Sequence, residues 1–175
     1  HGDREVVPGR ASIMSDAFDG FVDMLDYPMF VVTTRAGDDL AGCLVGFATQ
    51  ASIDPPTFLV GVSIDNHTYG VARRATHLAV HALSAEQIEV ARLFGGETGE
   101  AVDKFTRCAW HRGPEGLPVL DNVSGWFAGA VRDRFAMGDH IGHLLAPIAG
   151  ETSTRADRLL SFADVRTLQP GHGRS

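Results

Sequence analysis

Cysteine is scarce in this chain. Only Cys43 and Cys108 occur among its 175 residues, and no Cys-x-x-Cys spacing links them. They could form one disulfide, but nothing marks the protein as secreted, the setting in which structural disulfides are common. Cys43 lies within the apolar run of residues 41–45, which favours a buried free thiol.

An excess of basic charge is also absent. The chain carries 22 acidic and 15 basic side chains, which gives a formal net charge of −7. Proteins that bind DNA or RNA need a basic surface against the phosphate backbone. The charge balance therefore predicts no nucleic-acid partner.

Long apolar runs are missing as well. No stretch approaches the ~20 apolar residues that a membrane-spanning helix needs. Residues 1–5 are too polar to begin a signal peptide. We therefore expect no membrane partner and a cytoplasmic location.

The rest of the composition is that of an ordinary folded domain, with 44% hydrophobic and 21% charged residues. Short β-branched and aromatic runs, separated by glycine and proline turns, predict strands. These runs cover residues 29–34, 57–64, 77–83, 125–135 and 140–149, and residues 40–53 hold a further strand together with a stretch rich in glycine, alanine, serine and threonine. Helical spacing of apolar residues predicts a helix over 15–26, and residues 68–75 are expected to form one short helix. The fold class is therefore mainly β, a barrel or sandwich with helical decorations.

A third helix is predicted after Ser84, because Gln87 occupies the capping-box position. Phe94 to Gly99 contains three glycines and is expected to form a loop. Residues 105–119 are expected to be irregular. The segment after Gly150 is expected to fray, although residues 159–162 are apolar enough to pack.

The most informative segment runs from Gly42 to Pro56 and is rich in small and hydroxyl residues. Small residues let a backbone approach a flat ligand, and exposed N–H groups can hold an anion. Thr49, Gln50 and Ser52 add donors suited to a phosphate or a ribityl chain. The alternative is that small residues simply allow two strands to pack closely.

This segment resembles the flavin reductases of the FMN-binding split-barrel family. Those proteins carry a V-V-T-T strand, a glycine turn, a small-residue stretch ending in S-[LI]-[DS]-P-P, a polar turn, and then D-[KR]-F, P-V-L-D and G-D-H. The matching elements here are Val31–Thr34, Gly37, Gly42–Ala51, Ser52–Pro56, Asn66–Thr68, Asp103–Phe105, Pro118–Asp121 and Gly138–His140. They occur in the family's order over about residues 20–150.

The resemblance implies an FMN-binding split barrel over residues 15–150, followed by a C-terminal tail over 151–175. It also implies a homodimer with FMN near the subunit interface. A loop containing Phe94 is expected to cover the site. The implied cofactor-binding residues are Gly46, Phe47, Ala48, Thr49, Gln50, Ala51, Ser52, His67, Thr68 and Phe94.

The function implied by the resemblance is hydride transfer from NAD(P)H to flavin, with reduced flavin supplied to a monooxygenase. His140 is the candidate catalytic residue, and we interpret its role as positioning, since the cofactors carry the chemistry. This chain has Leu44, Gly46 and Phe47 where the family often has hydroxyl residues. That difference leaves two alternatives open: FAD or a deazaflavin in place of FMN, or a flavin-binding protein without turnover.

Histidine pairs do not predict a metal site. His77 and His81 lie in a predicted strand, where four residues span ~13 Å, too far for a shared ion. His140 and His143 are three residues apart, so on a strand they face opposite sides. We therefore expect no bound metal.

Overall fold

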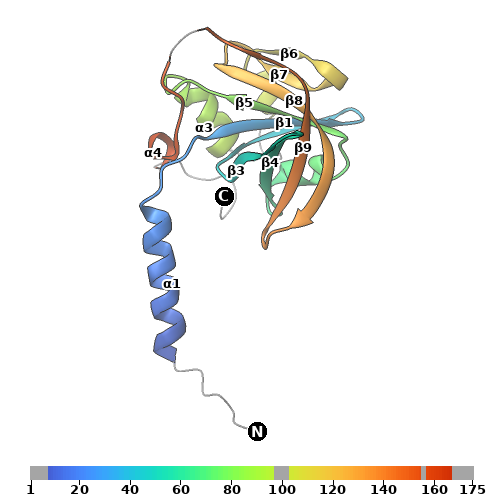
Figure 1. The fold of residues 1–175 in the computed structure, drawn as a ribbon. Helices are drawn as coiled ribbons and strands as arrows, with labels where there is room; N and C mark the ends of the chain where they lie inside the picture. Colours follow the sequence, from blue (N-terminus) through green and yellow to red (C-terminus); the bar gives the residue numbers. More distant parts are fainter. Residues whose placement is uncertain (1–7, 97–102, 155–156, 167–175) are drawn as a thin grey trace.

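The computed structural model describes residues 8–96, 103–154 and 157–166. Seven strands form one antiparallel sheet in the order β2-β1-β5-β8-β9-β4-β3, and two short strands form a separate hairpin. The sheet strands are β1 (Phe30–Ala36), β2 (Asp39–Val45), β3 (Ala48–Ile53), β4 (Pro56–Ser63), β5 (His77–Ala82), β8 (Gly125–Ala136) and β9 (His140–Thr152). The curled sheet in Figure 1 confirms the predicted barrel-like, mainly β fold.

Helical elements decorate the outside and the ends of this sheet. They are α1 (Pro8–Asp23), α2 (His67–Ala72), α3 (Ile88–Gly96), α4 (Phe162–Val165) and two short turns, η1 (Lys104–Thr106) and η2 (Pro114–Gly116). The region expected to be irregular, 105–119, contains the hairpin of β6 (Trp110–Arg112) and β7 (Pro118–Leu120). No helix in the described part of the chain is long and apolar enough to cross a membrane.

The sheet is split between two strands that follow each other in the sequence. β2 and β3 lie at opposite edges of the sheet, yet only Gly46 and Phe47 connect them. Three Cα–Cα steps span at most ~11 Å, so Val45 and Ala48 hold the two edges close together. The sheet must therefore curl until its edges meet, and we call this line the seam.

The sequence predicted the hairpin turns because they contain the residues that such turns require. Gly37 joins β1 to β2 with φ of +60°, and Gly138 joins β8 to β9 with φ of +116°. Glycine adopts these angles without the steric penalty that a Cβ would bring. The antiparallel register of β1–β2 follows directly from its turn, whereas the β8–β9 pairing shifts register between Ala128 and Gly129 and between Val131 and Asp133.

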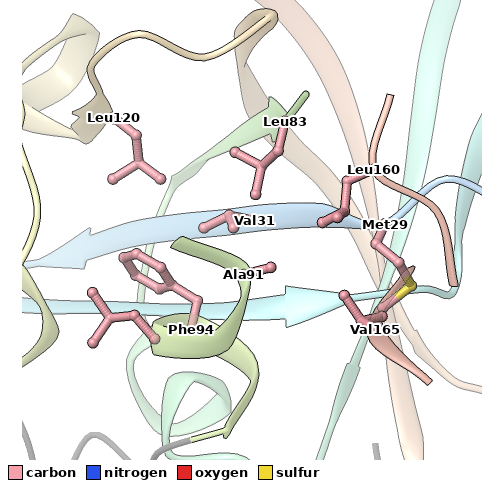
Figure 2. Close-up of a cluster of buried hydrophobic side chains, with 9 residues drawn as sticks. Met29, Val31, Leu83, Ala91, Phe94, Leu120, Leu160 and Val165 are labelled. Carbon is pink, nitrogen blue, oxygen red and sulfur yellow. The ribbon is translucent and has the colours of Figure 1, made fainter. Parts of the chain in front are cut away.

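Figure 2 shows the apolar cluster beneath α3, which includes Met29, Val31, Leu83, Phe94 and Leu160. Phe94 is only 2% exposed and packs edge-on against Phe105, with ring centroids 5.7 Å apart. The predicted loop over Phe94–Gly96 is therefore wrong. These residues form the last turn of α3, whose apolar face is anchored by Ala91 and Phe94, and residues 97–99 lie outside the described part.

Two further boundaries differ from the sequence prediction. The first helix begins earlier, at Pro8, and ends at Asp23 rather than Asp26. The helix after Ser84 begins only at Ile88, because Ser84 forms an extended bridge to Leu159 and residues 85–86 form a turn before the helix. The Ser84 N–H still donates to the Gln87 side chain, as the capping pattern predicts.

The C-terminal segment packs against the barrel. Leu160 is fully buried, Ser161 bridges to Pro28, and the Phe162 N–H donates to the Tyr27 carbonyl oxygen at 2.8 Å. Leu160 and Phe162 pack as expected, whereas Leu159 is 42% exposed.

α1 extends away from the barrel (Figure 1). Its apolar residues were predicted on helical spacing, but in the single chain they are exposed: 65% for Phe18, 55% for Phe21 and 75% for the following Met24. Spacing alone identifies an apolar side and does not say what covers it.

His81 ties the small hairpin to the barrel. Its ring is fully buried; Nδ1 lies 2.9 Å from the Val31 carbonyl oxygen, and Nε2 accepts the Leu120 N–H at 3.1 Å. These partners require a neutral ring with its proton on Nδ1. Burial lowers the pKa of His81 to about 4.

We expect His81 to make stability depend on pH. Below pH 6.5, the ordinary histidine pKa, His81 binds a proton in the unfolded chain. In the native chain His81 stays neutral down to about pH 4. The stability present above pH 6.5 is therefore lost as pH falls, by about 2 kcal/mol between pH 7.5 and pH 5. Urea unfolding at both pH values measures this loss.

The variant His81→Gln keeps one hydrogen-bond donor and one acceptor but cannot titrate. Its free energy of unfolding should therefore fall by about 2 kcal/mol less than that of the wild type between pH 7.5 and pH 5. His111→Gln, at an exposed histidine, serves as the control. An equal pH dependence in His81→Gln and the wild type would show that the assignment is wrong.

Candidate functional site

A cavity of about 190 Å³ lies on the seam, and we call it the seam cavity. β2 and the two-residue link supply one wall, and the opposite side comes from β4, the start of β9, and the segments around Tyr27 and Phe162. Its lining residues are Tyr27, Met29, Cys43, Leu44, Val45, Gly46, Phe47, Gly61, Ser63, Asn66, His140 and Phe162.

Phe47 and His140 meet at this cavity although they are far apart in the sequence. Their ring centroids are 4.7 Å apart and the rings are tilted by 55°. Phe47 is half exposed, and the side chain of His140 is only 12% exposed. His140 Nδ1 lies 2.8 Å from an Asp139 carboxylate oxygen, which fixes the orientation of the ring.

The opposite wall is aromatic and tightly packed. Tyr27 and Phe162 stack with centroids 5.0 Å apart and an angle of 18°. A Cβ on Gly46 would lie 2.7 Å from the Tyr27 ring and 2.9 Å from the Met29 sulfur. Only glycine fits at this position without displacing the wall.

Polar groups lie where β4 leaves the cavity. The Asn66 side chain accepts the Thr68 N–H at 2.9 Å and caps α2. The Ser63 hydroxyl oxygen accepts the Asp65 N–H at 3.3 Å. The cavity therefore combines flat apolar walls with a few polar groups at one end, the usual composition of a ligand site.

The structure brings together only some of the predicted site residues. Gly46, Phe47 and His140 line the seam cavity. Ala48 packs on the barrel core. Thr49, Gln50, Ala51 and Ser52 belong to the edge strand β3, whose polar side chains turn to nearby groups of their own segment. Ser52 donates to the Pro55 carbonyl oxygen at 2.5 Å, within the turn to β4.

The other predicted residues lie apart from the seam cavity. His67 is exposed and lines a second cavity, and Thr68 is buried in the first turn of α2. Phe94 lines neither of these two cavities, because it lies in the core. The role of Phe94 as a cover over a bound flavin stays a prediction.

Several lining residues were not predicted. Asn66 belongs to the polar turn of residues 66–68 that the sequence analysis identified, and its amide side chain could have indicated a binding residue. Tyr27 and Phe162 gave no such signal. They meet only because the C-terminal segment returns to the start of β1.

The second cavity measures about 700 Å³ and lies beside the first half of β2. We call it the edge cavity. Its lining residues are Asp38, Asp39, Leu40, Ala41, Gly42, His67, Gly70, Val71, Arg74, Asp103, Lys104, Phe105, Thr106 and Trp110. Lys104 is buried, and its Nζ donates to the carbonyl oxygens of Gly42 at 3.3 Å and Phe94 at 3.1 Å.

Comparison with known proteins assigns this architecture to a family. Residues 23–168 match the family model described as flavin reductase like domain. The stachydrine N-demethylase reductase subunit of Rhizobium meliloti is 34% identical over 114 residues, which cover 63% of this chain and 48% of that protein. The chain thus spans about half the length of this relative.

Two further proteins are similar over more of their length. An FMN reductase (NADH) of Bradyrhizobium diazoefficiens is 32% identical over 132 residues, covering 75% of this chain and 73% of that protein. The solved flavin reductase component of a bacterial two-component tryptophan halogenase superimposes with a TM-score of 0.74 at 27% identity, covering 85% and 92% of the two chains.

Cys43 lines the seam cavity and is a free thiol, as predicted. Burial raises its pKa to about 11, so little thiolate forms at neutral pH.

We expect a disulfide reagent such as dithiobis-nitrobenzoate to label only the half-buried Cys108 in the native protein at pH 8. The native Cys108→Ser variant should then show no fast-reacting thiol, and it should gain one on unfolding. Rapid native labelling of that variant would contradict the inertness of Cys43.

Proposed function

The chain belongs to the flavin reductase like domain family, and we propose that it transfers a hydride from NAD(P)H to FMN. The observation that carries this proposal is the seam cavity, where the Phe47 and His140 rings meet at 4.7 Å beside Gly46. Hydride transfer requires two flat rings held face to face, so a narrow cavity with aromatic walls suits it.

The residues present fit a flavin ring. Tyr27, Phe162 and Phe47 offer aromatic surface, and Gly46 keeps the link close to the wall. When bound, a flavin supplies the ring that accepts the hydride. Phe47 would shield that ring from water, and Asn66 and Ser63 would offer polar contacts to the ligand at one end.

His140 would act as a positioning residue at the mouth of the cavity. Its Nδ1 faces Asp139, so Nε2 is the nitrogen available for a ligand. A ring fixed in this way can orient a nicotinamide without taking a proton from it. The tilt against Phe47 limits how far the imidazole can turn.

The partner proposed for the reduced flavin is a separate monooxygenase. Support comes from relatives named as a demethylase reductase subunit and as a component of a two-component halogenase. In such systems one protein reduces the flavin and another uses it.

We expect purified protein to oxidise NADH or NADPH when FMN is added, followed as loss of absorbance of the reduced nicotinamide. His140→Ala should lower kcat/KM about tenfold, the effect of losing ~1.4 kcal/mol of orientation. His111→Ala is the matched control, because His111 also pairs with an aspartate, at 2.6 Å from Asp121, but lies outside the seam cavity.

No oxidation of either nicotinamide over a range of flavin concentrations would refute the proposal. Retention of FMN through dialysis in that case would favour a flavin-binding protein without turnover.

We further propose that the protein works as a homodimer in which the exposed side of α1 is covered by a second copy. Phe18 and Phe21 expose large apolar surface on a helix that extends from its own barrel. Exposed clusters of this kind usually mark an interface.

The dimer is tested by replacing Phe18 and Phe21 with glutamate. The double variant should elute as a monomer with a stable fold, because the charges cannot be buried. Light scattering gives the mass, and Asp16→Asn with Asp23→Asn is the control on the same helix. A monomeric wild type at micromolar concentration would exclude this arrangement.

A further inference from the structure

The Tyr27 hydroxyl is a polar group of the seam cavity that has no role in the hydride transfer proposed above. The half-buried ring of Tyr27 lines the cavity. A Cβ on Gly46 would lie 2.7 Å from the ring carbon Cε2, which is bonded to the carbon that carries the hydroxyl. The hydroxyl end of the ring, rather than its backbone end, therefore lies beside the link between β2 and β3.

The position of this ring is fixed by the C-terminal segment. Its face stacks on Phe162 with ring centroids 5.0 Å apart, and the Phe162 N–H donates to the Tyr27 carbonyl oxygen at 2.8 Å. The Ala163 N–H donates to the neighbouring Asp26 side chain at 3.0 Å. Figure 1 shows α4 beside the chain that enters β1. A hydroxyl on a ring held in this way is preorganised for a ligand, because little conformational freedom is lost on binding.

The C-terminal segment is itself ordered by charged side chains. Arg158 donates two hydrogen bonds of 3.0 Å to the Asp164 carboxylate, and the Ser161 N–H donates to the same carboxylate at 2.9 Å. The Arg166 guanidinium lies over the Phe162 ring, 5.5 Å from its centroid. These contacts fix the turn that carries Phe162, so the wall behind Tyr27 is present before a ligand binds.

The Tyr27 hydroxyl has no hydrogen-bond partner among the described residues. Tyrosine hydroxyls in buried surroundings usually have one. Ser63 and Asn66, by contrast, each accept a backbone N–H, and His140 directs Nδ1 to its neighbouring aspartate. Burial raises the pKa of Tyr27, so the hydroxyl keeps its proton at neutral pH. The cavity therefore contains a fixed hydrogen-bond donor without an acceptor.

A flavin ring supplies the acceptor that this donor lacks. One edge of the ring carries carbonyl oxygens and ring nitrogens, which accept hydrogen bonds. Negative charge develops on this edge when the ring is reduced. A hydrogen bond to a charged acceptor is stronger than one to a neutral acceptor, so a donor at this edge binds the reduced ring more tightly than the oxidised ring.

We infer that the Tyr27 hydroxyl donates a hydrogen bond to the polar edge of the flavin ring and thereby favours the reduced form. This inference rests on the proposed function, which puts a flavin in the seam cavity. In this role Tyr27 binds the cofactor and neither takes up nor releases a proton.

The first experiment observes the tyrosines directly. The chain has two tyrosines, and Tyr69, in α2, does not line the seam cavity. Protein labelled with fluorotyrosine therefore gives one fluorine resonance for each, and Tyr27→Phe assigns them. FMN should shift the Tyr27 resonance and leave the Tyr69 resonance unchanged, without any turnover. A Tyr27 resonance that is unchanged at saturating FMN, or that responds to NAD⁺ and not to FMN, overturns the inference.

The second experiment isolates the hydroxyl. Tyr27→Phe removes it and keeps the ring that stacks on Phe162. In anaerobic calorimetric titrations this variant should bind oxidised FMN about fivefold more weakly and reduced FMN more than about tenfold more weakly. Riboflavin, which lacks the phosphate, should lose the same factor as oxidised FMN, because the contact is made to the ring. Tyr69→Phe is the matched control and should bind both flavins as the wild type does.

The outcomes separate this inference from the proposed function. Equal FMN affinities of Tyr27→Phe and the wild type overturn the inference, and so does a loss that riboflavin does not share. Equal losses for oxidised and reduced FMN overturn the preference for the reduced form. Wild-type protein that binds FMN but oxidises neither NADH nor NADPH refutes the proposed function instead, and the titrations still decide the role of Tyr27.

Discussion

One covalent constraint organises this barrel: two consecutive strands occupy opposite edges of the same sheet. Gly46 and Phe47 are all that joins β2 to β3. A chain this short cannot cross a flat seven-stranded sheet, whose strands lie ~4.8 Å apart. The sheet therefore curls, and the seam brings β2, which pairs with β1, beside β4 and the start of β9.

The candidate site is a consequence of that seam. Edge strands leave backbone groups and side chains without a neighbouring strand, which gives a ligand access. Here the gap is closed by Phe47, by His140 at the start of β9, and by the Tyr27–Phe162 stack. Each comes from a different part of the chain, so the walls exist only in the folded barrel.

Buried polar side chains fix the parts that surround the barrel. His81 holds the β6–β7 hairpin through one donated and one accepted hydrogen bond. Lys104 joins β2 to the end of α3 through two carbonyl oxygens. Groups of this kind are stable in a core only when they are hydrogen-bonded, so they also specify which segments meet.

The sequence by itself determined most strands of the large sheet, the turns at Gly37 and Gly138, and the candidate residues Gly46, Phe47 and His140, because these depend on local conformation and ordered motifs. It missed the β6–β7 hairpin. It could not decide that Phe94 is a core residue, because the three glycines that follow Phe94 are typical of a loop. In the folded chain Phe94 packs against Phe105 and lies in the last turn of α3. Nor could it bring Tyr27 to Phe162, or divide β2 between two cavities. Tertiary structure decided these, because they depend on which distant segments share a surface.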